Sequence, residues 1–133
     1  MNFTNNLSLF YLLIILLPIS CSSQKKVMIF DENNQKIEVS KGETFGIKLP
    51  SHPGTGFTWQ LKGEPDSSYV KLIKQEYREL GDEQLDIPGM DYFEFEALKK
   101  GKTAITLWYI RLWKKDNDTN PDIRTEVYEI VIN

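Results

Sequence analysis

Apolar side chains recur at every second position in several short runs of this chain, and this period restricts the fold more than any other feature. The clearest run is residues 93–97, in which Phe93, Phe95 and Ala97 alternate with two glutamates. Successive side chains of a β-strand point to opposite faces, so such a run buries one face and exposes the other. No stretch of useful length has the 3.6-residue period of an amphipathic helix. The chain is therefore expected to fold from strands.

Turn-forming clusters of glycine, proline, asparagine and aspartate separate these runs. The predicted strands cover residues 27–30, 36–39, 44–49, 57–61, 69–79, 93–97, 103–112 and 125–132. Seven or eight short strands with turns between them predict an all-β fold, either a sandwich or a barrel. No linker to a second domain interrupts the pattern, so we expect one domain.

Three of these runs carry more specific expectations. The polar residues 31–34 between the first two strands are typical of a hairpin turn. Residues 103–112 are apolar on both faces, which predicts a central strand buried on both sides. Residues 69–79 show a mixed alternation, because Ile73 is out of phase with the apolar residues before it.

Composition excludes several classes of function. The chain has 133 residues, one cysteine, one histidine and a formal net charge of −3. A negative charge argues against a nucleic-acid partner, because phosphate binding needs a basic patch. One cysteine cannot form an internal disulfide, and one histidine cannot build a histidine-rich metal site. We therefore expect no cofactor, no metal and no enzymatic activity.

The first 20 residues carry no charged side chain, and residues 7–19 are almost wholly apolar. Thirteen such residues suit the core of a secretory signal and are too few for a membrane-spanning helix, which needs about 18. Ser20 precedes the only cysteine, Cys21, and this junction resembles the lipobox of bacterial lipoproteins. The resemblance implies that residues 1–20 are removed and that Cys21 becomes a lipidated N-terminus. The protein would then be an exported, membrane-anchored lipoprotein on the periplasmic or cell-surface side.

Two features differ from the usual lipoprotein signal. No lysine or arginine precedes the apolar run, and Pro18 stands where leucine is most frequent. An ordinary secretory signal with an incidental thiol at Cys21, or an uncleaved anchor, are therefore the alternatives. Residues 21–26 are predicted to be a short polar tether before a folded domain at residues 27–133.

Two loops are more specific in sequence than turns need to be. Residues 50–56 contain two prolines, which fix φ, and two glycines, which permit positive φ, so this loop has a defined shape at low entropic cost. In residues 109–114, Trp113 ends a strand beside the cations Arg111 and Lys114. Taken alone, a tryptophan at a strand end is more typical of a core plug than of a binding site.

Together these loops resemble chagasin and its bacterial relatives, which inhibit papain-like cysteine peptidases. The first loop of that family reads Asn-Pro-Thr-Thr-Gly-(Tyr/Phe)-x-Trp, and residues 52–59 read HPGTGFTW, which matches at all but two places. Another family loop carries Arg-Pro-Trp, and residues 111–113 read RLW. The glycine-rich loop of the family has its counterpart at residues 87–90, before the alternating phenylalanines. The resemblance covers nearly all of residues 26–133 in order.

The resemblance implies an immunoglobulin-like β-sandwich with three loops gathered at one end. A papain-type cleft is a groove with a thiolate and an imidazole at its base, and a reversible inhibitor must fill it without presenting a cleavable bond. The implied wedge is residues 53–56, with Trp113 and Arg111 against one wall and residues 88–90 against the other. The implied peptidase-binding residues are His52, Pro53, Gly54, Thr55, Gly56, Phe57, Pro88, Gly89, Met90, Arg111, Leu112 and Trp113.

Four positions differ from the family pattern. Gly54 replaces a threonine, so a side chain that would approach the catalytic centre is missing, and His52 replaces an asparagine that helps to hold the loop. Leu112 replaces a proline, and the glycine-rich loop keeps only Gly89. These differences bear on affinity and on the choice of target.

We expect the inhibitor to be a monomer. Other functions remain as alternatives to inhibition. The main alternative is a cell-surface ligand-binding or adhesion sandwich without inhibitory activity, which the differences at Gly54 and Leu112 favour. His52 as a catalytic base lacks an identifiable nucleophile and orienting partner, which favours a structural role. Residues 116–122 begin like a calcium loop, but Pro121 stands where glycine is needed, so a solvated turn is the preferred interpretation.

Overall fold

The computed structural model describes residues 26–80, 89–115, 119–121 and 123–133. Its elements are β1 (Met28–Phe30), β2 (Lys36–Val39), β3 (Thr44–Ser51), η1 (Pro53–Thr55), β4 (Phe57–Leu61), β5 (Val70–Arg78), β6 (Gly89–Ala97), β7 (Gly101–Arg111) and β8 (Arg124–Ile132). Every predicted strand is present, which confirms the all-β fold. Among the described residues, no helix has the length and apolar character needed to cross a bilayer.

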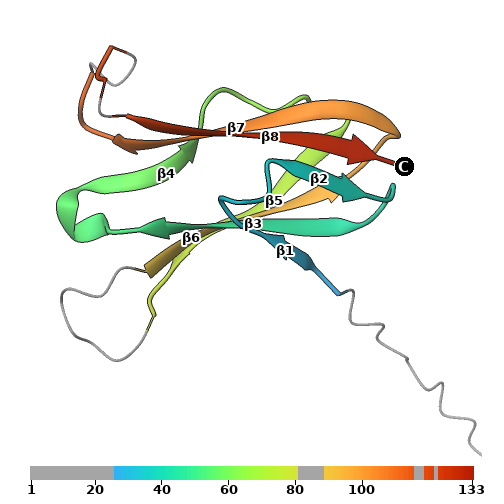
Figure 1. The fold of residues 1–133 in the computed structure, drawn as a ribbon, viewed down its shortest axis with the longest axis horizontal. Helices are drawn as coiled ribbons and strands as arrows, with labels where there is room; N and C mark the ends of the chain where they lie inside the picture. The colour runs from blue at the N-terminus through green and yellow to red at the C-terminus, as the bar shows by residue number, and fades with distance from the viewer. Residues whose placement is uncertain (1–25, 81–88, 116–118, 122) are drawn as a thin grey trace, which may run out of the picture.

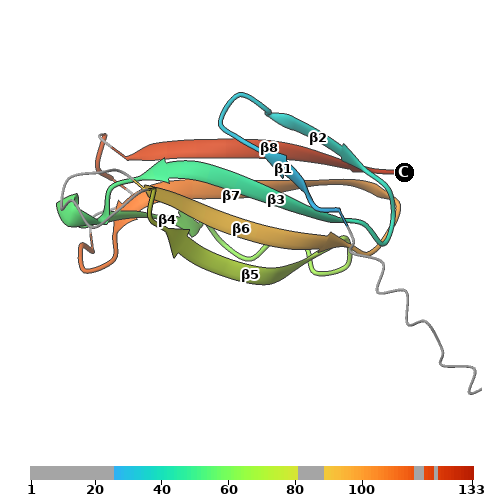
Figure 2. The ribbon, with the colours of Figure 1, turned by 90° about the horizontal axis from the view of Figure 1, so that it is seen from below.

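The eight strands of the described residues form two four-stranded sheets that pack face to face (Figure 1, Figure 2). One sheet has the order β1-β3-β6-β5, and the other has the order β2-β8-β7-β4. β1 pairs with β3 and β2 with β8 in parallel, while the other neighbours are antiparallel. The predicted immunoglobulin-like sandwich is thereby confirmed.

The core lies between the two sheets and follows the alternation in the sequence. The inward side chains of β3 and β6 include Phe45, Phe93 and Phe95, which are fully buried. The Phe45 and Phe95 rings stack with their centroids 5.6 Å apart. Trp59 and Tyr128 join the same cluster from the facing sheet. Burying each such side chain contributes about 1.5–3 kcal/mol to folding.

The predicted hairpin between the first two strands is wrong. β1 pairs with β3, with Met28 opposite Phe45, whereas β2 pairs with β8 in the other sheet, with Ile37 opposite Ile130. The polar turn after β1 therefore carries the chain from one sheet to the other. Turn residues specify that the chain reverses, but they do not select the partner strand, and consecutive strands are neighbours in only about two thirds of cases.

The seventh predicted strand is central, but it is not buried on both sides. In β7 the side chains of Ile105 and Leu107 are fully buried, whereas Ala104 is exposed and Trp108 is half-buried. A two-layer sandwich covers only one face of each sheet, so apolar residues on the outer face keep contact with solvent. The Lys62 Nζ atom lies 5.0 Å from the centroid of the Trp108 ring on that face.

A β-bulge explains the mixed alternation of the fifth strand. β5 pairs with β6 along its length, but the register shifts between Leu72 and Lys74. Ile73 is left out of the ladder and is 49% exposed. An extra residue in one strand reverses the faces on which the following side chains lie, and this produces the phase change seen in the sequence.

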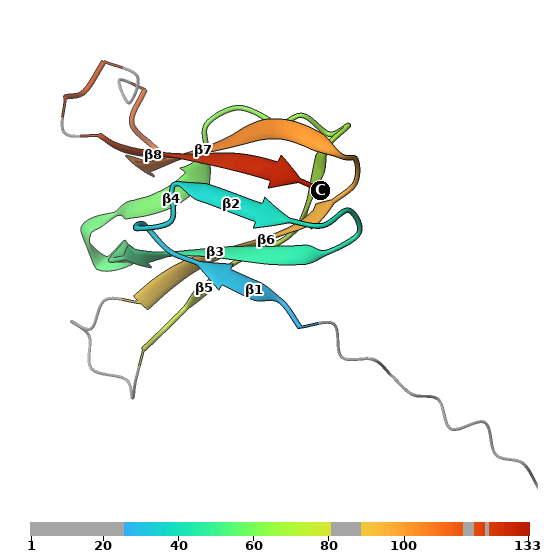
Figure 3. The same ribbon diagram turned by 45° about the vertical axis from the view of Figure 1, so that its right-hand side comes forward.

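One end of the sandwich, which we call the loop end, carries residues 52–56 between β3 and β4 (Figure 1, Figure 3). β5 and β7 end there, at Arg78 and Arg111, and β6 and β8 begin there, at Gly89 and Arg124. Pro50 and Arg78 both lie opposite Met90 at this end. β1 runs parallel to β3 and therefore begins at the opposite end, where the C-terminus also lies.

Candidate functional site

The first loop, residues 52–56, is closed by hydrogen bonds within itself. In η1 the Thr55 N–H donates to the His52 carbonyl at 3.0 Å, and the Gly56 N–H donates to the Pro53 carbonyl at 2.7 Å. The Thr55 hydroxyl also donates to the His52 carbonyl, at 2.7 Å. Pro53 restricts φ at the start of this turn. The loop therefore has a single compact shape before any partner arrives.

Gly56 ends this loop in a conformation that suits only glycine. Its φ is +85°, in the left-handed region, and the ring of Trp113 lies directly against its Cα, where a Cβ would overlap the ring. Gly54 has no such constraint: its φ is not positive, and a Cβ there would meet only the His52 ring, at 3.9 Å. The first loop and the β7–β8 connection are thus in contact at Gly56.

Tyr109 of β7 supports the first loop from beneath, and it is not among the binding residues predicted from the sequence. Its hydroxyl oxygen accepts a hydrogen bond from the His52 N–H at 2.9 Å. Its ring stacks on Phe57 at 5.3 Å between centroids and lies 5.1 Å from the Trp59 ring. The Arg111 guanidinium lies over Phe57, 4.3 Å from its centroid, which adds a cation–π contact. A stack of aromatic rings therefore joins β4 and β7 under the loop.

Two large apolar side chains project from the loop end. Leu112 is 65% exposed and Trp113 is 68% exposed, the highest values among the large hydrophobic residues of the described chain. Trp113 is therefore not a core plug, and the alternative drawn from its position at a strand end is wrong. Exposed aromatic residues with one face supported by the protein are typical of interaction sites.

The expectation for the glycine-rich segment needs a correction. Pro88 lies outside the described residues, but Gly89 and Met90 are the first residues of β6 and not of a loop. Gly89 is buried, and a Cβ there would overlap the Tyr77 side chain and the Arg78 carbonyl. Pairing of β6 with both β3 and β5 extends up to Gly89 or Met90, so the backbone that looked like a loop completes two ladders. Met90 is half-buried on the outer face.

A carboxylate that was not predicted holds the two sheets together at the loop end. Asp91 is 5% exposed, and its Oδ2 accepts hydrogen bonds from the Trp59 N–H at 2.9 Å and from the Thr58 hydroxyl at 3.2 Å. The Trp59 indole N–H donates to the Pro50 carbonyl at 2.9 Å. Asp91 occupies an inward position two residues before Phe93, where the alternation leads one to expect an apolar side chain. That break in the pattern was the signal available in the sequence.

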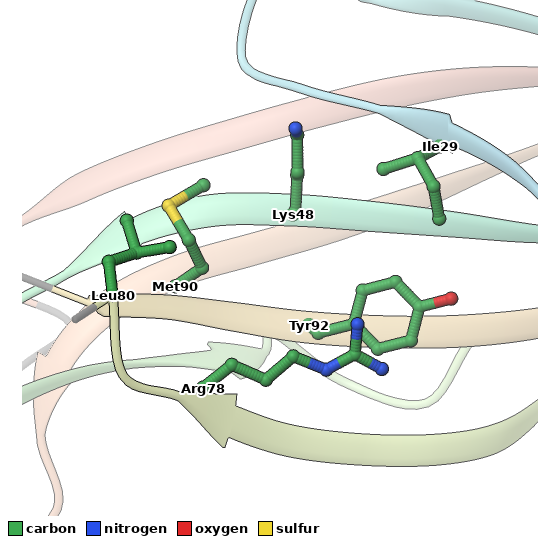
Figure 4. A pocket seen from close by; sticks show the side chains of 6 residues that line it. All are labelled: Ile29, Lys48, Arg78, Leu80, Met90 and Tyr92. Carbon is green, nitrogen blue, oxygen red and sulfur yellow. The ribbon is translucent and has the colours of Figure 1, made fainter. Parts of the chain in front are cut away.

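A pocket of about 290 Å³ lies on the outer face of the β1-β3-β6-β5 sheet, beside the loop end (Figure 4). It is lined by Ile29, Lys48, Arg78, Leu80, Met90 and Tyr92. The Arg78 guanidinium lies 4.1 Å from the Tyr92 ring centroid and forms an ion pair with Glu76. Burial, followed by the charge of Glu94, raises the pKa of the Tyr92 hydroxyl, so it stays neutral.

The described residues hold no cluster of metal ligands. No group of three or more histidine, cysteine, aspartate or glutamate side chains in this part of the chain could hold a metal ion. Asp116, Asp118 and Asp122 of the calcium-like sequence lie outside the described residues, as does Cys21. The surface that the structure does provide at the loop end is preformed and apolar, which suits binding to another protein.

Comparison with known proteins identifies relatives of this arrangement. Residues 38–130 match the model of the Chagasin family peptidase inhibitor I42. The chain is 30% identical over 84 residues to Chagasin of Trypanosoma cruzi. The aligned region covers 61% of this chain and 76% of that protein.

Solved structures show the same fold. The cysteine protease inhibitor EhICP2 from Entamoeba histolytica has a TM-score of 0.66 at 25% identity, over 80% of this chain and 95% of that one. PbICP-C, solved in complex with falcipain-2, has a TM-score of 0.57 at 18% identity, over 84% of this chain and 93% of that one.

Proposed function

The chain belongs to the chagasin family of peptidase inhibitors, and from this premise we propose that its loop end occludes the active-site cleft of papain-like cysteine peptidases. The protein acts as a reversible, non-catalytic inhibitor. Residues 53–56 form the wedge that enters the cleft above the catalytic thiolate. Trp113 with Arg111 lies against one wall of the cleft, and Met90 at the start of β6 lies against the other.

One observation carries this proposal: Trp113 rests against Gly56 while 68% of its surface stays exposed. The wedge and its largest apolar neighbour therefore form one continuous edge before binding. Immobilising a flexible side chain at an interface costs about 0.5–1.5 kcal/mol, and a preformed edge avoids most of that cost. An edge of this kind fills a narrow groove by shape and by apolar contact, without chemistry of its own.

The hydrogen bonds of the first loop explain how it can occupy a peptidase cleft without being cut. The His52 carbonyl accepts from both the N–H and the hydroxyl of Thr55, and the Pro53 carbonyl accepts from Gly56. A substrate must present an extended peptide whose carbonyl is open to attack. A 3₁₀ turn in which the His52 and Pro53 carbonyls are engaged within the loop is not an extended peptide, so we expect that binding is not followed by cleavage.

The test is a titration of the domain at residues 27–133 against papain and cathepsin-type peptidases. Trp113→Ala should raise the inhibition constant about 30-fold, corresponding to about 2 kcal/mol, because a buried tryptophan anchor is lost. Trp108→Ala is the matched control, since Trp108 lies on the outer face of β7 beside Lys62, and its loss should leave inhibition unchanged. Absence of inhibition by the wild type at micromolar concentrations would contradict the proposal.

The same titration addresses the second candidate function, a cell-surface ligand-binding sandwich without inhibitory activity. Gly54 favours this candidate, because the tip of the wedge has no side chain where the family has a threonine. If the domain binds a peptidase but the affinity is insensitive to both Thr55→Ala and Trp113→Ala, the contact surface lies elsewhere. That result would support the second candidate over inhibition through the loop end.

We also propose that the protein is a lipoprotein anchored through Cys21 to the periplasmic or cell-surface side of a membrane. The apolar residues 7–19 and the junction at Ser20 and Cys21 support this. Labelling with radioactive palmitate should mark the wild type and not the Cys21→Ala variant, which should appear in the soluble fraction. An unlabelled, soluble wild-type protein would contradict the anchor and leave the inhibitory proposal intact.

A further inference from the structure

We propose that Asp91 is a positioning residue that holds the exit of the first loop, at Thr58 and Trp59, against β6, so that the loop enters the peptidase cleft in one fixed orientation. This inference rests on the proposed inhibitory function, because it concerns the placement of the surface that binds the peptidase. Asp91 itself is 5% exposed and does not touch a partner. It would act through the strands that carry the binding residues.

The position of Asp91 in the fold is unusual for a carboxylate. It lies in β6 opposite Leu49 of β3 and Tyr77 of β5, and its side chain points inward, as do Phe93 and Phe95 further along the strand. A buried charge destabilises a fold unless hydrogen bonds compensate for its lost hydration. An apolar residue would pack at such a position at no electrostatic cost. The presence of a carboxylate there therefore has to be explained by the hydrogen bonds that it accepts.

The hydrogen bonds of Asp91 explain why a carboxylate stands at this position. β4 is an edge strand that pairs only with β7, so alternate N–H groups along it point away from its own sheet, and the Trp59 N–H is one of these. The Asp91 Oδ2 atom accepts from this N–H at 2.9 Å and from the Thr58 hydroxyl at 3.2 Å. Hydrogen bonds to an ionised acceptor are stronger and more directional than neutral ones. One carboxylate therefore ties the edge of one sheet to a central strand of the other.

Both ends of the first loop are held by hydrogen bonds between the two sheets. The Pro50 carbonyl, just before the loop, accepts from the Trp59 indole N–H at 2.9 Å, and Thr58 and Trp59, just after it, bond to Asp91. Asp91 in turn follows Gly89, the first residue of β6, by two positions. The β3–β6 ladder, which pairs Ser51 with Gly89, holds the entrance of the loop against the start of β6, and Asp91 holds its exit.

The experiment compares wild type with Asp91→Asn, which keeps the shape of the side chain and removes its charge. Amide hydrogen exchange should accelerate at least tenfold at Trp59, Thr55 and Gly56, and the inhibition constant for papain should rise at least tenfold. Ile132→Val and Ile132→Ala are the controls, because Ile132 is buried at the opposite end of the sandwich. The control that matches the loss of unfolding stability should leave these amides and the inhibition constant unchanged.

Each outcome decides one question. If the Asp91→Asn variant loosens the loop amides and weakens inhibition no more than the matched Ile132 variant does, Asp91 is only a stabilising residue and the inference is overturned. If wild type fails to inhibit while Asp91→Asn still loosens the loop amides selectively, the inhibitory proposal fails and the positioning role stands. Should Asp91→Asn not fold, Thr58→Val removes one of the two hydrogen bonds and should give a smaller change in the same direction; no change would overturn the inference.

Discussion

At the scale of single residues, two glycines in the first loop have opposite requirements. Gly56 has φ +85° and lies under the Trp113 ring, whereas Gly54 has an ordinary φ and open space around its Cα. Only the first of these positions needs glycine for a conformational reason. The second is a place where the chain lacks a side chain that its backbone would accept.

Alanine substitutions separate the two cases. Gly54→Ala should stabilise the domain by about 0.4–1 kcal/mol, because it restricts the unfolded chain and strains nothing in the fold. Gly56→Ala should destabilise it by about 1 kcal/mol or more, because a Cβ is strained at positive φ and displaces Trp113. Urea unfolding at neutral pH measures both changes.

Tryptophan fluorescence provides a check on the cause. Displacement of the Trp113 ring in Gly56→Ala should shift the emission towards that of a fully solvated indole, whereas Gly54→Ala should leave the spectrum unchanged. Equal destabilisation by the two variants would show that the contact between Gly56 and Trp113 does not constrain the loop.

At the scale of elements, β8 runs from the loop end past the turn between β1 and β2, where the chain passes from one sheet to the other. Tyr128 in this strand is almost fully buried, and its hydroxyl donates to the Asp31 carbonyl at 3.3 Å, in the turn that carries the chain from β1 to β2. Burial, followed by the charges of Glu126, Asp31 and Glu32, raises the pKa of this hydroxyl far above its usual value of 10.0.

This raised pKa predicts a loss of stability in alkali. Below pH 10 the phenol is neutral in both states and its contribution is fully present. Above pH 10 the unfolded chain releases the proton while the folded chain retains it, so the free energy of unfolding falls by up to about 1.4 kcal/mol per pH unit. Tyr128→Phe should remove this slope, which urea unfolding from pH 8 to pH 11 measures. A wild type and a variant that decline in parallel would contradict the assignment.

At the scale of the whole molecule, both sheets share one core. Phe95 packs on Phe45 within its own sheet and belongs to the same cluster as Trp59 and Tyr128 of the facing sheet. Each sheet has an apolar inner face that only the other can cover. The two sheets are therefore expected to unfold together, in one cooperative transition.

Phe95→Ala tests this cooperativity. Removing the ring should lower the free energy of unfolding by about 3–5 kcal/mol, since it deletes buried area and leaves a cavity between the sheets. Far-ultraviolet circular dichroism and tryptophan fluorescence should report the same urea midpoint for this variant. Separate midpoints would mean that one sheet keeps its structure without the other.

Several features of the fold and of the site follow from the sequence because they depend on neighbours along the chain. The two-residue period alone determined which segments are strands and which of their side chains face inward, as Phe93 and Phe95 do. The prolines and glycines of residues 52–56 determined that the first loop is stiff, since they restrict or free φ locally. The family resemblance then added the expectation of a three-loop binding end.

Contacts between distant parts of the chain were decided only by the tertiary structure. The bond from His52 to Tyr109 spans 57 residues and that from Trp59 to Asp91 spans 32. The hairpin predicted at residues 31–34 failed for the same reason, because the partner of each strand depends on which sheet edge is open. Local periodicity indicates the face on which a residue lies and not which residues it contacts there. The hydrogen bonds of Tyr109 and Asp91 that support the loop end therefore followed only from the packing of the two sheets.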